Sequence, residues 1–220
     1  GCLGKNTGVG DLVSTAGEKS VNRPSGTIRC ADFFAEDGTL PLEAHVIVGN
    51  PPWGPVMKNK PATNGEIWCS KRKLEHPNRE KSIPFIWKAP THLGNDGKVC
   101  FVLPHGTLFN HNDTAIRFQQ SLLRAHAVTR VVNLTDYRFF LFEESLAPAL
   151  VIRYRKERPK DSSQLIEYWA PKTDWAVRQA EILRVLPQDR SRFTIREVLD
   201  DLRSDDAPRI WKERFWATPR

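Results

Sequence analysis

The chain has 220 residues, of which 40% are hydrophobic and 27% charged, a composition typical of a globular protein rather than a disordered one. Its 33 Lys and Arg outnumber 26 Asp and Glu, and the resulting charge of +7 favours a polyanionic partner. No apolar run approaches the roughly 20 residues that cross a bilayer, and no signal-peptide pattern opens the chain. We therefore expect a cytoplasmic protein without a membrane partner.

The four cysteines do not form a CxxC pair, which argues against a disulfide framework and a structural zinc site. Cys69 and His76 would supply only half of a metal site. We expect no bound metal.

The first part of the chain contains two predicted strands and two predicted loops. Residues 1–26 are rich in Gly, Ser, Thr, Asn and Lys and are expected to form a loop or linker. Residues 27–34 read as a short strand, and residues 44–49 as a continuous apolar strand buried on both faces, typical of a central parallel strand. Residues 58–81 read as a long polar loop, a kind that compact domains keep mainly for function.

A helix, a strand and a second helix are predicted next. Ser82 is a candidate N-cap for a helix with Pro84 in its first turn, and Pro90 should shorten or kink that helix. A strand is expected at 98–104 after a GNDG turn. An amphipathic helix is expected at 114–126, capped by Asn112 or Asp113.

Strands at 128–134 and 147–156 complete the predicted sheet. Alternation of strands and helices predicts a Rossmann-like α/β sheet that is mostly parallel. The strand at 147–156 follows a loop too short for a crossover helix, so we expect it to run antiparallel at an edge. The composition changes near Lys160, which predicts a domain at 27–158, followed at 159–220 by a linker and the start of a C-terminal module.

The segment HVIVGNPPWGP, residues 45–55, carries the strongest chemical signal. Two prolines fix φ and remove two N–H donors, so the carbonyls of Asn50 and Pro51 are held in fixed directions at the carboxyl end of a strand. If the Asn50 side-chain oxygen and the Pro51 carbonyl each accept one N–H of a planar amine, its nitrogen can pyramidalise and attack a methyl group. Trp53 would stack on the base that carries the amine, after that base leaves the duplex.

The order and spacing of several motifs resemble the catalytic half of adenine-N6 DNA methyltransferases of the NPPY/NPPW type, especially large restriction-modification methylases. The resemblance covers about residues 27–156 and rests on DFF, HVIVGNPPWG, FIWKAPTHLGNDGKVCFVLP, RFQQSLLRAHAVTRVVNL and LAPALVIRYRK. It implies an S-adenosylmethionine-dependent methyltransferase fold with base flipping. The NPPW motif with its strand is specific, and the other motifs are individually weak.

The resemblance also implies roles for individual residues. Asn50 and Pro51 would bind the target amine and lie near the methionine part of S-adenosylmethionine, and Trp53 would stack on the flipped adenine. Pro52, between them in the motif, is the fourth candidate catalytic residue. Asp32 would accept a hydrogen bond from the adenine amine of the cofactor, with Phe33 beside that ring. The alternatives are a capping carboxylate for Asp32 and a core aromatic for Phe33. Similarly, the aromatic segment YRFFLFEE is either a second stacking face or core.

Two features of the resembled family have no match in this chain. These are the glycine-rich loop after the first strand and the acidic residue that grips the cofactor ribose. In the family's strand order two further strands lie between the strand at 27–34 and the strand at 44–49. Their absence would leave one edge of the strand at 44–49 unpaired and the strand at 27–34 without its neighbours. We therefore expect an N-terminal cofactor-binding segment, or another chain, to supply these parts, and a linked target-recognition or nuclease module is a further expected partner.

The predicted loop at 58–81 is basic and follows the NPPW motif directly. Phosphate contacts to double-stranded DNA are one interpretation, and a solvated run of charges is the other. The candidate nucleic-acid-binding residues are Lys58, Lys60, Trp68, Lys71, Arg72 and Lys73.

The sequence thus predicts a DNA adenine-N6 methyltransferase, or a fragment of one, in a restriction-modification or phage-defence system. Two alternatives stay open. One is a methyltransferase that acts on protein glutamine or on RNA, because the same motif suits any planar amide or amine. The other is an inactive, truncated module that contacts nucleic acid.

Overall fold

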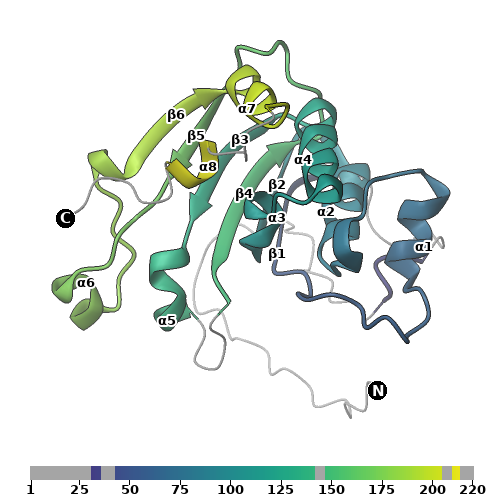
Figure 1. Cartoon of the computed structure of the whole chain (residues 1–220), viewed down its shortest axis with the longest axis horizontal. Coiled ribbons are helices and arrows are strands. Elements are labelled where there is room, and N and C mark those ends of the chain that lie inside the picture. The colour runs from purple at the N-terminus through teal and green to yellow at the C-terminus, as the bar shows by residue number, and fades with distance from the viewer. Residues whose placement is uncertain (1–30, 36–42, 142–146, 205–209, 214–220) are drawn as a thin grey trace, which may run out of the picture. The chain divides into compact units, whose positions relative to one another are not determined.

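A computed structural model describes residues 31–35, 43–141, 147–204 and 210–213 (Figure 1). The description below concerns the unit Asp32–Arg220. The loop or linker expected at 1–26 lies outside the described residues.

Six strands form one sheet in the order β1-β2-β4-β3-β5-β6. β1 pairs with β2 and β3 pairs with β5 in parallel, whereas β4 is antiparallel to both of its neighbours and β6 to β5. β1, β2, β3 and β5 therefore point the same way, and their carboxyl ends share one edge of the sheet. The strands are β1 Ala44–Gly49, β2 Leu93–Pro104, β3 Val128–Asn133, β4 Ala149–Arg155, β5 Leu165–Trp169 and β6 Arg190–Thr194.

The α/β fold predicted from the sequence is confirmed as a mixed sheet, in which three of the five strand pairings are antiparallel. The position of the strand expected at 147–156 needs a correction. β4 is antiparallel as expected, but the edge position is wrong because β4 lies between β2 and β3. Leu150 and Ile152 of this strand are fully buried, which suits an interior position. Within the described residues β6 is the antiparallel edge strand.

The helices are short apart from α4, whose Asn112 N-cap accepts a hydrogen bond from the Ala115 amide at 2.8 Å. This confirms the amphipathic helix predicted there, and α2 ends two residues before Pro90, as predicted. No helix in the described parts of the chain has the length and apolarity that a membrane span needs. The α-helices are α1 Asn64–Lys71, α2 Ile83–Lys88, α3 Gly106–Phe109, α4 Asp113–Ala125, α5 Arg138–Leu141, α6 Trp175–Ala180, α7 Ile195–Asp201 and α8 Ile210–Glu213. The 3-10 helices are η1 Pro77–Arg79, η2 Ala89–His92, η3 Thr135–Tyr137 and η4 Pro187–Asp189.

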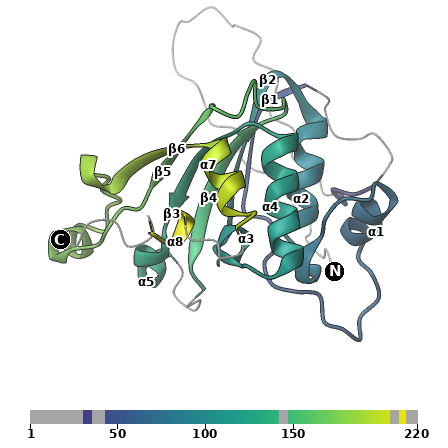
Figure 2. The same ribbon diagram turned by 45° about the horizontal axis from the view of Figure 1, so that its top comes forward.

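One face of the sheet builds the hydrophobic core. Helices α2, α4 and α7 cover this face (Figure 2). Val99 and Leu103 of β2 and Tyr154 of β4 are fully buried in the same hydrophobic cluster as residues of these helices. Ile86 of α2 and Phe118 of α4, also fully buried, belong to the same cluster. Alternate residues of the strands thus point into the helical layer, because side chains alternate between the two faces of a strand.

The opposite face of the sheet carries no buried residue in its central cross-strand row. Strand register aligns Val48, Cys100, Arg153, Arg130, Glu167 and Arg192 in this row. The expectation that 44–49 is a central strand buried on both faces is wrong for the described part of the sheet. β1 stands at the end of the strand order, with Val46 60% and Val48 73% exposed.

The segment after Lys160 belongs to the same sheet as the residues before it. β5 pairs with β3, and Ile166, Tyr168 and Phe193 join the core built by the earlier strands. The prediction that residues 159–220 form a linker and a separate module is therefore wrong for the described residues. The change of composition near Lys160 therefore does not mark the start of a new core.

Candidate active site

The NPPW turn follows β1 directly and lies at the edge of the sheet where β2, β3 and β5 also end. Asn50 and Pro52 are exposed, Pro51 is buried, and Trp53 is half-buried. A Cβ atom at Gly49 would lie 3.3 Å from the Phe101 ring, so glycine allows the end of β1 to approach β2 closely. The turn therefore starts from a fixed strand end and holds the Asn50 side chain toward solvent.

After Trp53 the chain folds against residues 79–81. The Gly54 amide donates to the Glu80 Oε1 atom at 2.7 Å, and the Lys81 amide donates to the Gly54 carbonyl at 3.2 Å. The Val56 amide donates to the Arg79 carbonyl at 2.9 Å. The far end of the loop thus returns to the turn and pairs with it.

The polar loop expected at 58–81 is partly helical, which corrects the prediction. Thr63 and Glu66 form a capping box at the start of α1, with the Glu66 amide 3.2 Å from Thr63 Oγ1 and the Thr63 amide 2.8 Å from Glu66 Oε2. The T-x-x-E spacing that signals such a box is visible in the sequence. No apolar period follows this box, so the sequence pattern alone does not predict a helix here.

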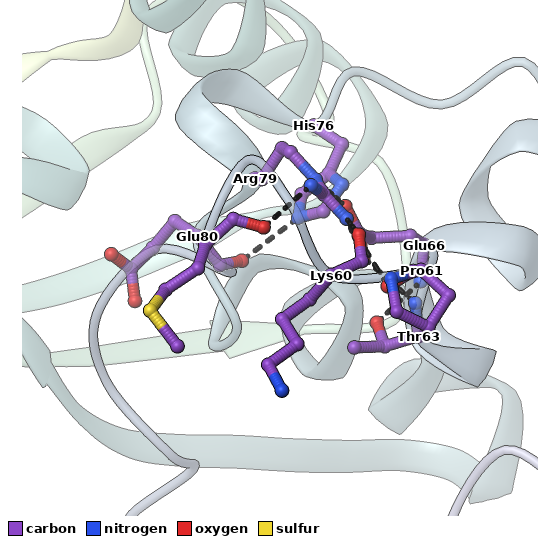
Figure 3. Close-up of polar contacts among 8 residues, drawn as sticks. Lys60, Pro61, Thr63, Glu66, His76, Arg79 and Glu80 are labelled. Carbon is purple, nitrogen blue, oxygen red and sulfur yellow. Dashed lines mark hydrogen bonds and ion pairs between the residues drawn. The ribbon is translucent and has the colours of Figure 1, made fainter.

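Arg79 ties this loop together (Figure 3). Its Nε atom donates to Glu66 Oε1 at 2.6 Å, and its guanidinium also donates to the carbonyls of Met57, Lys60 and Pro61 at 3.0 to 3.3 Å. The hydrogen bond from Arg79, followed by those from Thr63, lowers the pKa of Glu66 from 4.5 to about 2. We call these contacts the Arg79 clasp.

Asp32 lies in a turn, whereas the sequence predicted a strand at 27–34; residues 27–30 of that prediction lie outside the described residues. The Asp32 Oδ1 atom accepts the Phe34 amide at 2.9 Å, and this local hydrogen bond favours a turn over a strand. Asn64 of α1 donates to the other oxygen. Both hydrogen bonds, that of Phe34 first, lower the pKa of Asp32, so this exposed carboxylate is ionised at neutral pH.

Phe33 belongs to an aromatic cluster rather than standing alone. Its ring stacks on Phe85 of α2 with centroids 5.1 Å apart, and the Lys88 ammonium donates to its carbonyl at 2.5 Å. A Cβ atom at Gly65 of α1 would lie 3.1 Å from the Phe34 ring. The segment with Asp32 and the NPPW turn are therefore attached to the same block, made of α1, α2 and the chain between them.

The candidate nucleic-acid-binding residues differ in exposure. The five basic side chains are exposed, namely Lys58, Lys60, Lys71, Arg72 and Lys73. Trp68 is 6% exposed, with its ring near Phe34 and the Arg72 guanidinium 4.2 Å from its centroid. The expected base contact of Trp68 is not supported, because helix α1 turns this ring into the core.

Two further predictions concern aromatic residues and metal ligands. Phe139, which the sequence left between stacking face and core, is 62% exposed and lines a cavity of about 200 Å³ at the ends of β3 and β5. Cys69 is buried, which raises its pKa to about 12. Over the described ranges, no three His, Cys, Asp or Glu side chains gather as metal ligands.

Comparisons with known proteins show which family this chain resembles in sequence and which proteins it resembles in fold. The model of the family described as N-6 DNA Methylase matches residues 19–189. A comparison with curated proteins gave no significant match. The methyltransferase subunit of a type I restriction-modification system from Streptococcus thermophilus has a similar structure, with a TM-score of 0.55, 18% identity, and coverage of 78% of this chain and 39% of that one.

Two other solved structures share the fold. One is DrdV in a complex with DNA, with a TM-score of 0.51, 17% identity, and coverage of 69% of this chain and 17% of that one. The other is the type IIG restriction endonuclease BpuSI, with a TM-score of 0.50, 13% identity, and coverage of 78% and 21%. This chain thus spans less than two-fifths of each of these three proteins. The family match covers well over half of the sequence, so the chain belongs to the N-6 DNA methylase family.

Proposed function

We propose that this chain is the catalytic portion of a methyltransferase that transfers a methyl group from S-adenosylmethionine to the N6 amine of adenine in DNA. The system would be a restriction-modification or phage-defence system. The observation that carries the proposal is the NPPW turn at the carboxyl end of β1, with Asn50 exposed above a buried Pro51. Membership of the N-6 DNA methylase family supports it.

The turn suits an amine whose lone pair is delocalised into a ring. The Asn50 side-chain oxygen and the Pro51 carbonyl would each accept one N–H of the adenine amine, which favours a pyramidal nitrogen with an available lone pair. Pro51 and Pro52 lack N–H donors and have fixed φ, so the two acceptors need no rearrangement. Trp53 is half-buried and would stack on the flipped base, a contact worth roughly 1 to 3 kcal/mol.

Asp32 and Phe33 fit the adenine end of the cofactor. Asp32 is exposed and ionised, so it can accept a further hydrogen bond from the adenine amine. Phe33 is half-buried, and Phe85 covers one face of its ring. S-adenosylmethionine would supply an electrophilic methyl group, and the chain's own residues would orient the amine toward it.

Duplex DNA is the proposed substrate. Five exposed basic residues follow the turn at 58–73, and the whole chain has a charge of +7, which suits a phosphate backbone. Among the structures with the same fold, DrdV was solved bound to DNA. The other two are a methyltransferase subunit of a type I restriction-modification system and a type IIG restriction endonuclease. A target-recognition or nuclease module linked to this portion is part of the proposal.

The test is methyl transfer from labelled S-adenosylmethionine to duplex DNA, RNA and protein in parallel, by this chain together with the cofactor-binding segment or chain that the sequence predicts. We expect label in adenine N6 of DNA, and loss of at least a hundredfold in rate with Asn50→Ala while DNA binding is kept. Asn95→Ala, at an exposed position in β2, is the matched control and should be fully active.

Other outcomes separate the alternatives. Label in protein or RNA but not in DNA would favour the enzyme that acts on glutamine or RNA. DNA binding with steep salt dependence, no cofactor binding, and indifference to Asn50→Ala would favour a nucleic-acid-binding module without activity.

A further inference from the structure

The NPPW turn has few backbone donors with which to hold its shape. Pro51, Pro52 and Pro55 lack an N–H group, so the amides that anchor the chain just after Trp53 are those of Gly54 and Val56. Both are bonded to the far end of the loop, Gly54 to the Glu80 carboxylate at 2.7 Å and Val56 to the Arg79 carbonyl at 2.9 Å. Of these two hydrogen bonds, only the one to Glu80 has a side-chain acceptor, so a substitution can remove it.

Gly54 has a backbone conformation that few other residues adopt. Its φ is +88°, a left-handed value, and a Cβ atom at this position would meet nothing within 4 Å. Glycine is thus required by the backbone conformation and not by lack of space. Since proline fixes φ at three neighbouring positions, most of the remaining freedom lies at Trp53 and Gly54. A group that holds the Gly54 amide therefore also limits the direction of the Trp53 ring.

Glu80 is itself held from several sides. Its Oε1 atom also lies 3.4 Å from the Ser82 hydroxyl, which donates to it, and its carbonyl contacts the His76 Nε2 atom at 2.9 Å. Glu80 forms an isolated antiparallel bridge with Pro55, and its own amide donates to Pro77 at 3.1 Å. Its neighbour Arg79 forms the clasp on Glu66 (Figure 3). The carboxylate therefore reaches Gly54 from a fixed backbone.

We propose that Glu80 is a positioning residue for the methyl transfer, which acts through the Gly54 amide to set the direction of Trp53 and the acceptor oxygens before it. This inference rests on the proposed function for its role in the reaction, but the contact itself can be tested without any activity. Glu80 touches neither base nor cofactor in this scheme. A charged acceptor strengthens the hydrogen bond compared with a neutral one.

The direct test is NMR of the full chain labelled with ¹⁵N. In the wild type the Gly54 amide should be protected from hydrogen exchange, and Glu80→Ala should speed its exchange about tenfold to a hundredfold. Glu80→Ala should also move the Trp53 indole resonance, while the amides of β2 and β4 keep theirs. Glu75→Ala is the matched control, because Glu75 lies in the same segment and its carboxylate forms a long ion pair with Arg117 at 3.6 Å. It should leave Gly54 and Trp53 unchanged.

Glu80→Gln separates positioning from a general effect on folding. It keeps an oxygen acceptor, so Gly54 should stay protected, but loss of the charge should shift its amide proton upfield. This variant also serves if Glu80→Ala does not fold. An unprotected Gly54 amide in the wild type, or an unchanged Gly54 resonance in Glu80→Gln, would overturn the proposal.

Methyl-transfer kinetics test whether Glu80 affects the reaction. Glu80→Ala should lower kcat about tenfold to a hundredfold with little change in KM for DNA, and Glu80→Gln should recover most of the rate. Equal kcat in Glu80→Ala and wild type would refute the positioning role. If the wild type transfers no methyl group although the NMR results are as expected, the proposed function fails and the contact between Glu80 and Gly54 stands.

Discussion

The hydroxyl of Tyr154 in β4 donates a hydrogen bond to the carbonyl of Ile86 in α2 at 2.8 Å, and both residues are fully buried. In a continuing α-helix the Ile86 carbonyl would accept the amide four residues later, but that residue is Pro90, which has no N–H. Tyr154 thus provides the donor that the proline lacks and joins the end of α2 to the centre of the sheet. Burial also raises the pKa of Tyr154 well above its usual value, so the hydroxyl stays protonated.

Tyr154→Phe should destabilise the chain by about 1 to 2 kcal/mol, because it leaves a buried carbonyl without a donor and changes little else in the packing. Urea unfolding followed by circular dichroism measures the effect. Pro90→Ala in the Tyr154→Phe background restores an N–H near Ile86 and should recover part of the loss. A change below about 0.5 kcal/mol in the single variant would contradict this account.

The Arg79 clasp predicts a pH dependence of stability. The pKa of Glu66 is about 2 in the folded chain, lower than its ordinary value of 4.5. A lowered pKa in the folded state means that the carboxylate stabilises the fold above about pH 4.5 and that this contribution is lost as the pH falls toward 2. Glu66→Gln should therefore be less stable than the wild type at neutral pH, by about 1 to 3 kcal/mol, and this gap should narrow in acid.

Thermal unfolding at neutral pH, pH 4 and pH 3 measures the gap. Glu75→Gln is the control, since the ion pair of Glu75 with Arg117 is long, at 3.6 Å, and partly exposed to solvent, so its loss should change stability by less than about 1 kcal/mol. A gap between wild type and Glu66→Gln that stays constant from neutral pH to pH 3 would rule out the carboxylate as its origin.

The sequence predicted those elements whose signals are local. α4 has a regular apolar stripe and an Asn112 cap, and α2 has Pro84 in its first turn and Pro90 beyond its end, so both were found. The NPPW turn was found because Asn, two prolines and an aromatic residue after an apolar strand form a recognisable unit. In these cases residues close in sequence determine the structure.

The features that the sequence did not predict depend on distant residues. The place of β4 between β2 and β3 is set by pairing on both sides, and a strand pattern does not name its partners. α1 was read as loop because its apolar stripe is weak, and Arg79, 13 residues from Glu66, helps to hold it. The sequence does not predict the contact between Glu80 and Gly54, because the two residues lie 26 positions apart.

The two faces of the sheet predict different effects of the same substitution. Val48 of β1 is 73% exposed, and Val99 of β2, on the other face, is fully buried. Val99→Ala should cost about 2 to 3 kcal/mol through lost burial and a cavity, whereas Val48→Ala should stay within about 0.5 kcal/mol. Urea unfolding of both variants gives the comparison. A large loss for Val48→Ala would mean that other residues cover this valine in solution.

The last prediction concerns the basic residues after the NPPW turn. Arg79 holds the carbonyls of Met57, Lys60 and Pro61, so the backbone that carries Lys58 and Lys60 is fixed. The Lys60 side chain points away from the Arg79 clasp (Figure 3) and, like that of Lys58, is exposed. Such side chains can reach phosphates of a duplex whose flipped base lies at the turn. Each phosphate contact steepens the fall of log K for DNA binding with log salt by about 0.9.

The double variant Lys58→Ala/Lys60→Ala should therefore make the negative slope of log K for DNA binding against log salt shallower by about 1 to 2. Binding should weaken to a similar extent for all DNA sequences. Fluorescence anisotropy of a labelled duplex, measured at several salt concentrations, gives the slope. Arg124→Ala, an exposed position on α4, is the matched control and should leave the slope unchanged. If the double variant keeps the wild-type slope, these lysines do not contact phosphate, and the positive charge that attracts DNA lies elsewhere on the chain.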